Sequence, residues 1–383
     1  MLHATSKHLE TDEPQVAIAL NPFNAQARFQ AILDADLQDK DRGAAQREIE
    51  TNLVTSVGDA RNFSLLGTLR RKEGMVEQAQ ALFAAALRLN PSEPNAAREQ
   101  IDLDISARRY DDALRRVDVY TRKGGPGAQD IAGHLVRLAL ADPNAQAAVM
   151  KGLAADPPWR SAFLSELQKT PSSLSLVPRA LAILQTSARK PTEPEIAGAV
   201  RAFLSAGNPA AAYRLFVTSR DEASRPLISF VYDPEFRAAP SGNPFDWAIA
   251  NSGAAEVRIP APGDGGAEIG FLERPGAGFG MSQTLALLPG AYGGALKASA
   301  MSVVAPDGVF VYVRCASGRT LAKADIPHGT YNNREIDFRF EVPSTGCDLQ
   351  TLGFATNQIF QHWSRTYSGT LRIHSARLAT INE

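Results

Sequence analysis

The chain has 383 residues, of which 44% are hydrophobic, and its formal net charge is −1. This composition is that of a globular protein with an ordinary core, and the balanced charge argues against the basic excess typical of nucleic-acid-binding domains. No apolar run approaches the roughly 20 residues that a membrane-spanning helix needs.

Residues 1–25 are interpreted as an N-terminal tail or a partial repeat. Residues 1–15 contain no hydrophobic segment of the kind found in signal peptides. Residues 16–22 nevertheless look like the end of a helical repeat, because they match residues 86–91 closely, and the helix that should precede them is missing. Either this repeat is degenerate, or the chain is a fragment from which an upstream anchor or signal has been removed. The sequence leaves both open.

Apolar residues recur three and four positions apart between residues 26 and 225, which predicts helices. The pattern is clearest in residues 60–93. Phe63 is expected to face inward from a first helix, Gly74 to relax the turn, and Ala79 to let a second helix pack closely. The residues that carry the whole pattern are Phe63, Leu66, Gly67, Gly74, Ala79, Phe83, Ala86 and Pro91.

This 34-residue pattern resembles the tetratricopeptide repeat. Weaker units in phase with it occupy residues 26–59, 94–127 and 193–219, and prolines interrupt the register between residues 128 and 192. The resemblance implies an all-α solenoid over residues 26–225 whose concave surface binds a protein partner. It places several residues of the first helices on that surface, as candidates to hold a peptide or a carboxylate. These are Asp34, Arg61, Arg71, Lys72 and Arg98. Ordinary solvated helix faces are the alternative.

The pattern changes after Pro226 to short β-type segments separated by clusters of Gly, Pro, Asn and Asp. About eight strands without intervening helices predict an antiparallel sandwich of the jelly-roll type over residues 226–383. The expected strands are residues 227–232, 256–259, 268–272, 283–288, 308–315, 335–342, 350–355 and 369–373.

Several segments of this half resemble jelly-roll carbohydrate-binding modules of the galactose-binding-like kind. They are residues 243–247 (NPFDW), 283–292 (QTLALLPGAY), 338–343 (FRFEVP) and 371–378 (LRIHSARL). A repeat solenoid joined to such a module resembles proteins of bacterial exopolysaccharide systems. The resemblance implies a sandwich that contacts a glycan, although it does not identify the sugar.

Sugar-binding modules stack aromatic rings on sugar faces with polar groups beside them. Residues 360–367 lie between two expected strands and combine both kinds of side chain, and residues 331–334 form a weaker loop candidate. The candidate glycan-binding residues are Trp363, His362, Arg365, Tyr367, Tyr331 and Asn333. The alternative is that Trp363 folds inward to cover one end of the sandwich. Trp247 is assigned to the core.

Both cysteines of the chain, Cys315 and Cys347, lie in the expected sandwich. They form either a disulfide or two buried thiols. A bridge over this span would stabilise the fold by about 3–4 kcal/mol in the chain-entropy model. Because disulfides persist in oxidising compartments, a bridge would favour a periplasmic or cell-envelope location, with a cytoplasmic one as the alternative.

The sequence contains no metalloprotease, nucleophile-elbow, Walker or Cys-x-x-Cys motif, and the acidic cluster at residues 34–41 misses the spacing of a calcium loop. We therefore expect no catalytic site, metal or cofactor. The interpretation is a non-catalytic scaffold that binds a protein partner through the solenoid and a polysaccharide through the sandwich. A pure protein-interaction scaffold is the alternative, and a glycan-modifying enzyme is the least favoured one.

Overall fold

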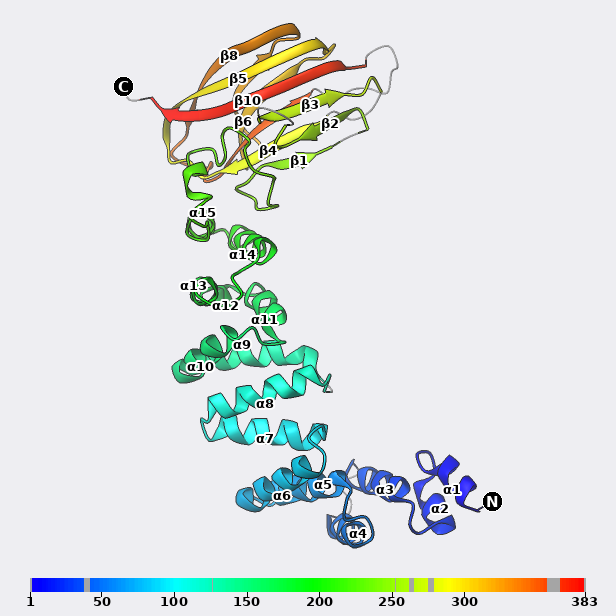
Figure 1. Cartoon of the computed structure of the whole chain (residues 1–383). Helices are drawn as coiled ribbons and strands as arrows, with labels where there is room; N and C mark the ends of the chain where they lie inside the picture. The colour runs from blue at the N-terminus through cyan, green and yellow to red at the C-terminus, as the bar shows by residue number, and fades with distance from the viewer. Residues whose placement is uncertain are drawn as a thin grey trace. The chain divides into compact units, whose positions relative to one another are not determined.

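The computed structural model describes residues 2–37, 42–125, 127–251, 253–261, 265–274, 279–356 and 366–381. The chain forms two compact units, Met1–Glu166 and Leu167–Glu383. A helical region is followed by an all-β sandwich, which confirms the predicted fold class (Figure 1). The last α-helix ends at Thr218 and the first strand begins at Ala248, on either side of the change of pattern in the sequence.

The first unit is helical throughout its described part. Neighbouring helices pair in sequence, as α5 with α6 and α7 with α8 (Figure 1). The helices are α1 (Leu2–Leu9), α2 (Pro14–Leu20), α3 (Ala25–Leu37), α4 (Arg42–Thr55), α5 (Ala60–Lys72), α6 (Val76–Leu89), α7 (Pro94–Ser106), α8 (Tyr110–Arg122), α9 (Ile131–Ala141) and α10 (Pro143–Leu153). Helix α11 (Arg160–Leu167) ends at the boundary between the units.

The α5–α6 pair shows why residues 60–93 carry the clearest pattern. The carboxylate of Asp59 accepts a hydrogen bond from the Arg61 N–H and so caps α5. Phe83 and Ala79 of α6 are fully buried against α5. Gly67 of α5 provides the space for the Phe83 ring, because a Cβ atom at Gly67 would lie 2.6 Å from Phe83 Cε1. The small residues of the pattern are therefore packing requirements.

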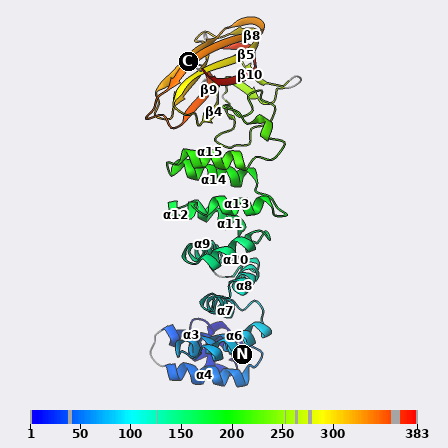
Figure 2. The same cartoon turned by 90° about the vertical axis from the view of Figure 1, so that its left-hand side faces the viewer.

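The second unit begins with a short helical part. Helices α14 and α15 lie side by side as a hairpin (Figure 2). The elements are α12 (Pro171–Leu174), α13 (Val177–Gln185), α14 (Glu193–Ser205) and α15 (Pro209–Thr218). Thr192 caps α14 in a reciprocal capping box with Glu195.

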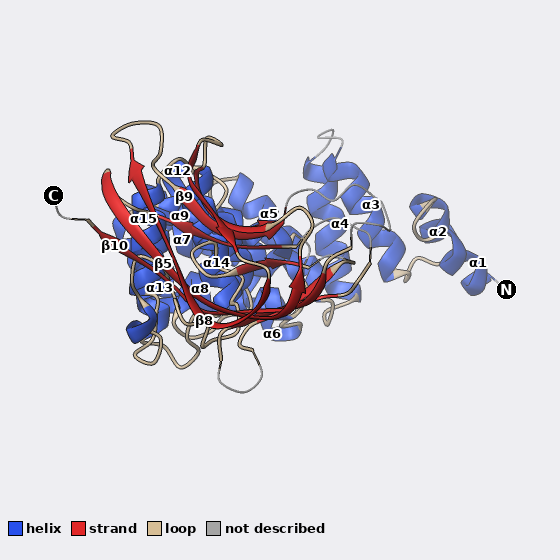
Figure 3. Ribbon diagram, turned by 90° about the horizontal axis from the view of Figure 1, so that it is seen from above, coloured by secondary structure: helices blue, strands red, loops and turns tan. Residues whose placement is uncertain are grey.

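Two five-stranded antiparallel sheets form the sandwich of the second unit. Sheet A has the strand order β1-β4-β9-β6-β7 and sheet B the order β2-β3-β10-β5-β8. The long strands β5, β8 and β10 run side by side in sheet B (Figure 3). The strands are β1 (Ala248–Ala250), β2 (Ala255–Arg258), β3 (Ala267–Phe271), β4 (Gly280–Leu285), β5 (Gly290–Val304), β6 (Val309–Cys315), β7 (Thr320–Ile326), β8 (Gly329–Val342), β9 (Gln350–Thr356) and β10 (Ser368–Thr380).

The inner faces of both sheets form one hydrophobic core. Trp247 is 1% exposed and packs between Phe236 and Phe354, so its assignment to the core is confirmed. The strand expected at residues 227–232 is wrong. Tyr232 instead exchanges two hydrogen bonds with the side chain of Gln283: its N–H donates to Oε1 and its carbonyl accepts from Nε2, both at 2.8 Å. A buried amide thus takes the place of a neighbouring strand.

Helix α15 packs directly on the segment that leads into the sandwich. The Phe216 ring lies 5.0 Å from the ring of Tyr232 and 5.6 Å from that of Phe245, and Tyr213 also contacts Phe245 at 5.2 Å. The guanidinium of Arg220 lies 4.7 Å above Phe216. Because Gln283 of β4 holds Tyr232 in place, the helical hairpin and the sandwich share one packed boundary within the second unit.

Candidate functional site

The predicted glycan-binding segment divides into two parts in the structure. Trp363, His362 and Arg365 lie outside the described residues. Tyr367 is 1% exposed: its ring packs 5.4 Å from that of Phe271 in the core, and its hydroxyl donates to the Gly308 carbonyl. Its proposed role in stacking on a sugar is wrong, because neither face of the ring reaches solvent.

The second predicted candidate, residues 331–334, is part of strand β8 and not a loop. Tyr331 is half-buried and packs against the core, and its hydroxyl has no hydrogen-bond partner in the described part of the chain. Asn333 is exposed at a bulge of β8, where its N–H donates to Ser299 Oγ at 3.0 Å. The structure therefore separates these residues: the half-buried Tyr331 packs against the core, and Asn333 is exposed.

A different set of aromatic side chains lies on the outer face of sheet A. Along β6, Val309, Val311 and Val313 are buried in the core, so the alternating residues point outward. Phe310 and Tyr312 are among these, and their ring centroids lie 6.0 Å apart. Both side chains are partly exposed. The two rings form an aromatic pair on a surface of the sandwich that the core does not need.

The strands beside this pair carry small residues on the same face. Tyr312 lies opposite Gly353 of β9, which in turn lies opposite Ser282 of β4. In the next row Phe310 lies opposite Ala355. The ring of Tyr312 covers Gly353, since a Cβ atom there would overlap the ring. The result is a shelf of small side chains bordered by two aromatic rings.

Charged groups frame the aromatic pair. The ammonium of Lys323 on β7 lies 3.9 Å from the centre of the Phe310 ring, and the guanidinium of Arg314 lies 5.3 Å from that of Tyr312. Asp325 follows on β7, opposite Phe310. We call the outer-face residues Phe310, Tyr312, Arg314, Lys323 and Asp325, with the small residues beside them, the sheet A platform. It offers stacking surfaces, donors and one carboxylate.

The sheet A platform is not apparent from the sequence. Residues 308–315 were expected to form a strand, but Val309, Val311 and Val313 alternate with Phe310, Tyr312 and Arg314, so both faces carry large apolar groups. The sequence does not say which face is the core. Gly353 indicates an exposed aromatic ring only once the register of β6 and β9 is known, because that register places it opposite Tyr312.

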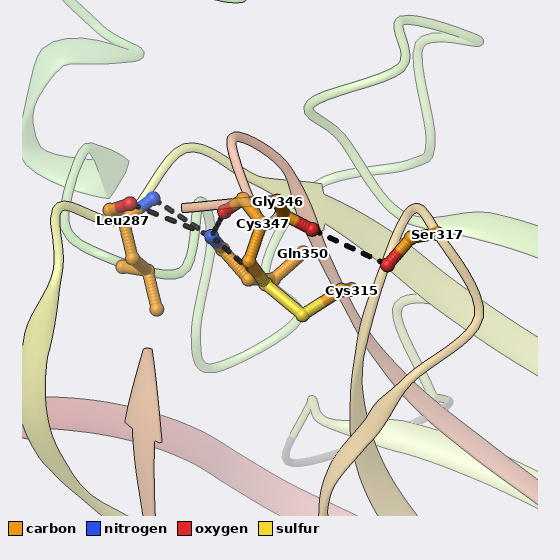
Figure 4. Close-up of a disulfide and its surroundings, with 6 residues drawn as sticks. All are labelled: Leu287, Cys315, Ser317, Gly346, Cys347 and Gln350. Atoms are coloured by element: carbon orange, nitrogen blue, oxygen red, sulfur yellow. Dashed lines mark hydrogen bonds between the residues drawn. A yellow bond between two sulfur atoms is a disulfide. The ribbon is translucent and has the colours of Figure 1, made fainter. Parts of the chain in front are cut away.

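The two cysteines form a disulfide with a Cα–Cα distance of 5.1 Å. It joins the end of β6 to the loop before β9, beside the buried side chain of Gln350 (Figure 4). Gln350 Oε1 accepts from the Leu287 N–H, and Nε2 donates to the carbonyls of Leu287 and Cys347. These bonds fix two loops at one end of the sandwich, where the sequence alone predicts only a possible cysteine bridge.

Two of the predicted peptide-binding residues of the helical region bind their own neighbours. Arg61 donates to the carboxylate of Asp59 and to Gln26 Oε1, and its guanidinium lies 4.4 Å from the centre of the Phe29 ring. The Asp59 carboxylate raises the pKa of Arg61 further above its ordinary value. This arginine joins α3 to α5.

Arg71 of α5 pairs with Glu99 of α7, and Asp102 lies 3.8 Å away. Lys72 and Arg98 are both exposed, and Arg98 donates to Asn95 Oδ1 at 3.2 Å. Asp34 lies on α3, but its side chain is outside the described part. Of the described side chains, those of Arg61 and Arg71 are thus held by neighbouring residues of the chain, whereas Lys72 and Arg98 are exposed.

Within the described ranges, no three His, Cys, Asp or Glu side chains come together as metal ligands. No helix in that part of the chain is both long enough and apolar enough to cross a membrane. On the described strands of sheet A, Asp325 is the only carboxylate of the outer face.

No protein-family model matches the sequence, and no curated protein is similar to it. Similar solved structures include a CBM4 carbohydrate-binding module, at 16% identity over 40% of this chain and 99% of that one, with a TM-score of 0.32. A second is TmCBM61 in complex with β-1,4-galactotriose, at 13% identity over 40% and 99%, with a TM-score of 0.28. A third is PilW, a widely conserved type IV pilus biogenesis factor, at 16% identity over 54% and 95%, also with a TM-score of 0.28. Likenesses this weak say nothing about what this chain binds.

Proposed function

We propose that the protein is a non-catalytic adaptor that binds a polysaccharide on the sheet A platform and a protein partner through its helical repeats. The observation that carries the proposal is the ring of Tyr312, which lies across Gly353 beside Phe310 on an outward-facing sheet surface. Flat rings of this kind match the apolar faces of pyranose sugars, and the neighbouring polar groups can bind their hydroxyls.

The shape of the platform suits an extended chain. Small residues on β9 and β4, such as Gly353 and Ser282, leave room beside the rings for a ligand that crosses the strands. The rings of Phe310 and Tyr312 are not needed to fill the core, because the inward-facing valines of β6 do so. The competing role is structural: a ring over a cross-strand glycine also stabilises a sheet. If the ring binds glycan, its removal should weaken glycan binding. If its role is only structural, its removal should lower the stability of the fold and leave the glycan affinity of the folded protein unchanged.

Binding without catalysis is the favoured activity. Glycoside hydrolysis commonly uses two carboxyl groups that face each other across the bond to be cleaved. The platform contributes Asp325 alone from the described strands. Its other groups, Arg314 and Lys323, hold and orient a ligand, and they do not supply the acid–base pair.

We also propose the cell envelope or periplasm as the location, in an exopolysaccharide system. The Cys315–Cys347 disulfide supports the location, because such bonds persist outside reducing compartments. Fractionation of the native cells followed by mass measurement of the non-reduced protein tests it. A cytoplasmic protein with both thiols free would contradict it.

The experiment for the glycan half is an array of polysaccharides and oligosaccharides probed with the full chain. The variants are Tyr312→Ala and Phe310→Ala, with Phe23→Ala as the control, because Phe23 is 77% exposed in the first unit. Loss of binding in the platform variants alone, with unchanged thermal unfolding, supports the proposal. Trp363→Ala belongs in the same array, since a loss confined to that variant would move the site to residues 360–367. No binding by the folded wild-type chain would refute the glycan half.

A further inference from the structure

A groove of about 680 Å³ lies in the first unit, between the end of α6, the start of α7 and the outward face of α8. Apolar groups form its floor. Val119 of α8 is 48% exposed there, and Leu87 of α6 and Ala97 of α7 line it as well. Val119 and the apolar side chains beside it form an exposed apolar surface, and its burial by another molecule would be favourable.

The rim of the groove carries an excess of positive charge. Arg116 lines it and shares the buried carboxylate of Asp104 with Arg109, at 2.9 and 2.7 Å, so two cations face one anion. Lys123 donates to the hydroxyl of Ser92 at 2.9 Å and contacts no carboxylate within the described residues.

Arg115 also lines the groove and pairs with Asp112. Its side chain is 74% exposed, so this pair is solvated and contributes little to stability. Together the lining cations Arg115, Arg116 and Lys123 outnumber the lining carboxylate, Asp112. The groove therefore combines an apolar floor with a basic rim.

This groove differs from the surface that the repeat pattern predicts for peptides. That surface relies on α5 and α7, where Arg61 and Arg71 are held by Asp59 and Glu99. The groove lies instead beside α8, and three of its four charged lining residues are cations. Charge and apolar exposure thus coincide at α8.

We propose that the groove docks an acidic amphipathic segment of a partner protein. Its large apolar side chains would cover Val119 and Leu87, and its carboxylates would meet Arg115, Arg116 and Lys123. An amphipathic helix laid in a groove is a common form of such recognition. The inference rests on the proposed role of the helical repeats in binding protein, and it names the surface and the chemistry of the partner.

The test is a phage-displayed library of random peptides of about four helical turns, selected on the full chain. Affinities of the selected peptides are then measured by fluorescence anisotropy against Val119→Glu and Lys123→Glu. Matched controls are Val54→Glu, at a valine that is 81% exposed on α4, and Lys7→Glu, at an exposed lysine of α1. Thermal unfolding of each variant shows that it is folded.

The expected result is enrichment of peptides that combine carboxylates with large apolar residues. Val119→Glu and Lys123→Glu should weaken their binding about tenfold or more, the controls should not, and added salt should weaken binding to the wild-type chain. If the selected peptides bind the Val119→Glu variant with unchanged affinity, the groove is not their binding site, although the helical region could still bind protein elsewhere. Failure to select any peptide on the folded chain would contradict both the groove proposal and the proposed protein-binding role. The glycan array tests the proposed function of the sandwich independently.

Discussion

The ring of Tyr312 on β6 covers Gly353 on β9, its register partner in sheet A. The absence of a side chain at Gly353 is what lets the ring lie against the sheet, beside Phe310. The contact between Tyr312 and Gly353 is therefore part of the packing of sheet A and also shapes the surface that we propose for glycan binding. A change at Gly353 alters the platform without removing any of its functional groups.

The Gly353→Ala variant should lose both stability and glycan binding. The added methyl group would overlap the Tyr312 ring, which must turn away from the sheet, and such overpacking costs about 1–3 kcal/mol. Gly270→Ala is the control, because a Cβ atom at this β3 glycine would meet nothing within 4 Å. Urea unfolding and the glycan array measure the two effects. A folded Gly353→Ala protein with unchanged glycan affinity would contradict a binding role for Tyr312.

Gly67→Ala should destabilise the first unit although it lies inside a helix. Alanine favours a helix over glycine by about 1 kcal/mol, but its methyl group would lie 2.6 Å from Phe83 Cε1. The steric term is larger, so we expect a net loss of about 1–2 kcal/mol in urea unfolding. Gly58→Ala, where nothing lies within 4 Å, should change stability by less than about 0.5 kcal/mol. A second substitution, Phe83→Leu, should recover part of the Gly67→Ala loss, and equal stability of the two alanine variants would contradict the packing account.

The helical hairpin over residues 60–93 could be predicted because its packing requirements are local in sequence. Gly67, Ala79 and Phe83 lie within one hairpin, so their spacing reports a contact between adjacent helices. The order of helices followed by a sandwich was predictable for the same reason, since the periodicity of apolar residues changes with the type of element.

The strands were less predictable where their residues have weak β preference. Strand β5 (Gly290–Val304) is rich in Gly and Ala, and it falls between the strands expected at residues 283–288 and 308–315. It is a strand because β8 and β10 pair with it on both sides. The same pairing turns residues 331–334 from an expected loop into part of β8.

The candidate site depended on contacts that sequence spacing does not contain. Tyr367 lies just before β10, in a segment expected to be a loop, but its ring packs beside Phe271 of β3. Strands β3 and β10 pair although they are far apart in the sequence, with Thr370 opposite Gly270. Conversely, the sequence does not distinguish the Phe310–Tyr312 face of this strand from the Val309–Val311 face, and the structure buries the valines and leaves the two rings outside. Register, not composition, decides which aromatic side chains meet solvent.

Removal of the Cys315–Cys347 disulfide should destabilise the second unit. The chain-entropy model gives about 3–4 kcal/mol for a bridge that spans 32 positions. The double variant Cys315→Ala/Cys347→Ala should unfold at a lower urea concentration than the wild-type protein. A reducing agent should shift the wild-type transition toward that of the variant and leave the variant itself unchanged. A wild-type transition that does not respond to reductant would contradict a structural bridge.

Acid should weaken the contact between the segment that precedes the sandwich and β10. Glu235 pairs with Arg377 of β10 and with Arg237, and the hydrogen bond from Arg377, followed by the one from Arg237, holds the pKa of its carboxyl below the ordinary 4.5. A carboxyl whose pKa is lower in the folded state than in the unfolded state stabilises the fold above the unfolded value, and this stabilisation is lost as the pH falls from 4.5 through the folded pKa.

The side chains of Arg377 and Glu235 are 62% and 30% exposed, so solvent screens their interaction and the effect should stay below about 1 kcal/mol. Glu235→Gln removes the titrating group and should flatten this part of the dependence of unfolding free energy on pH, whereas Glu256→Gln, at an exposed pair on β2, serves as the control. Equal pH profiles for the wild-type and Glu235→Gln proteins would show that Glu235 does not anchor this segment to β10.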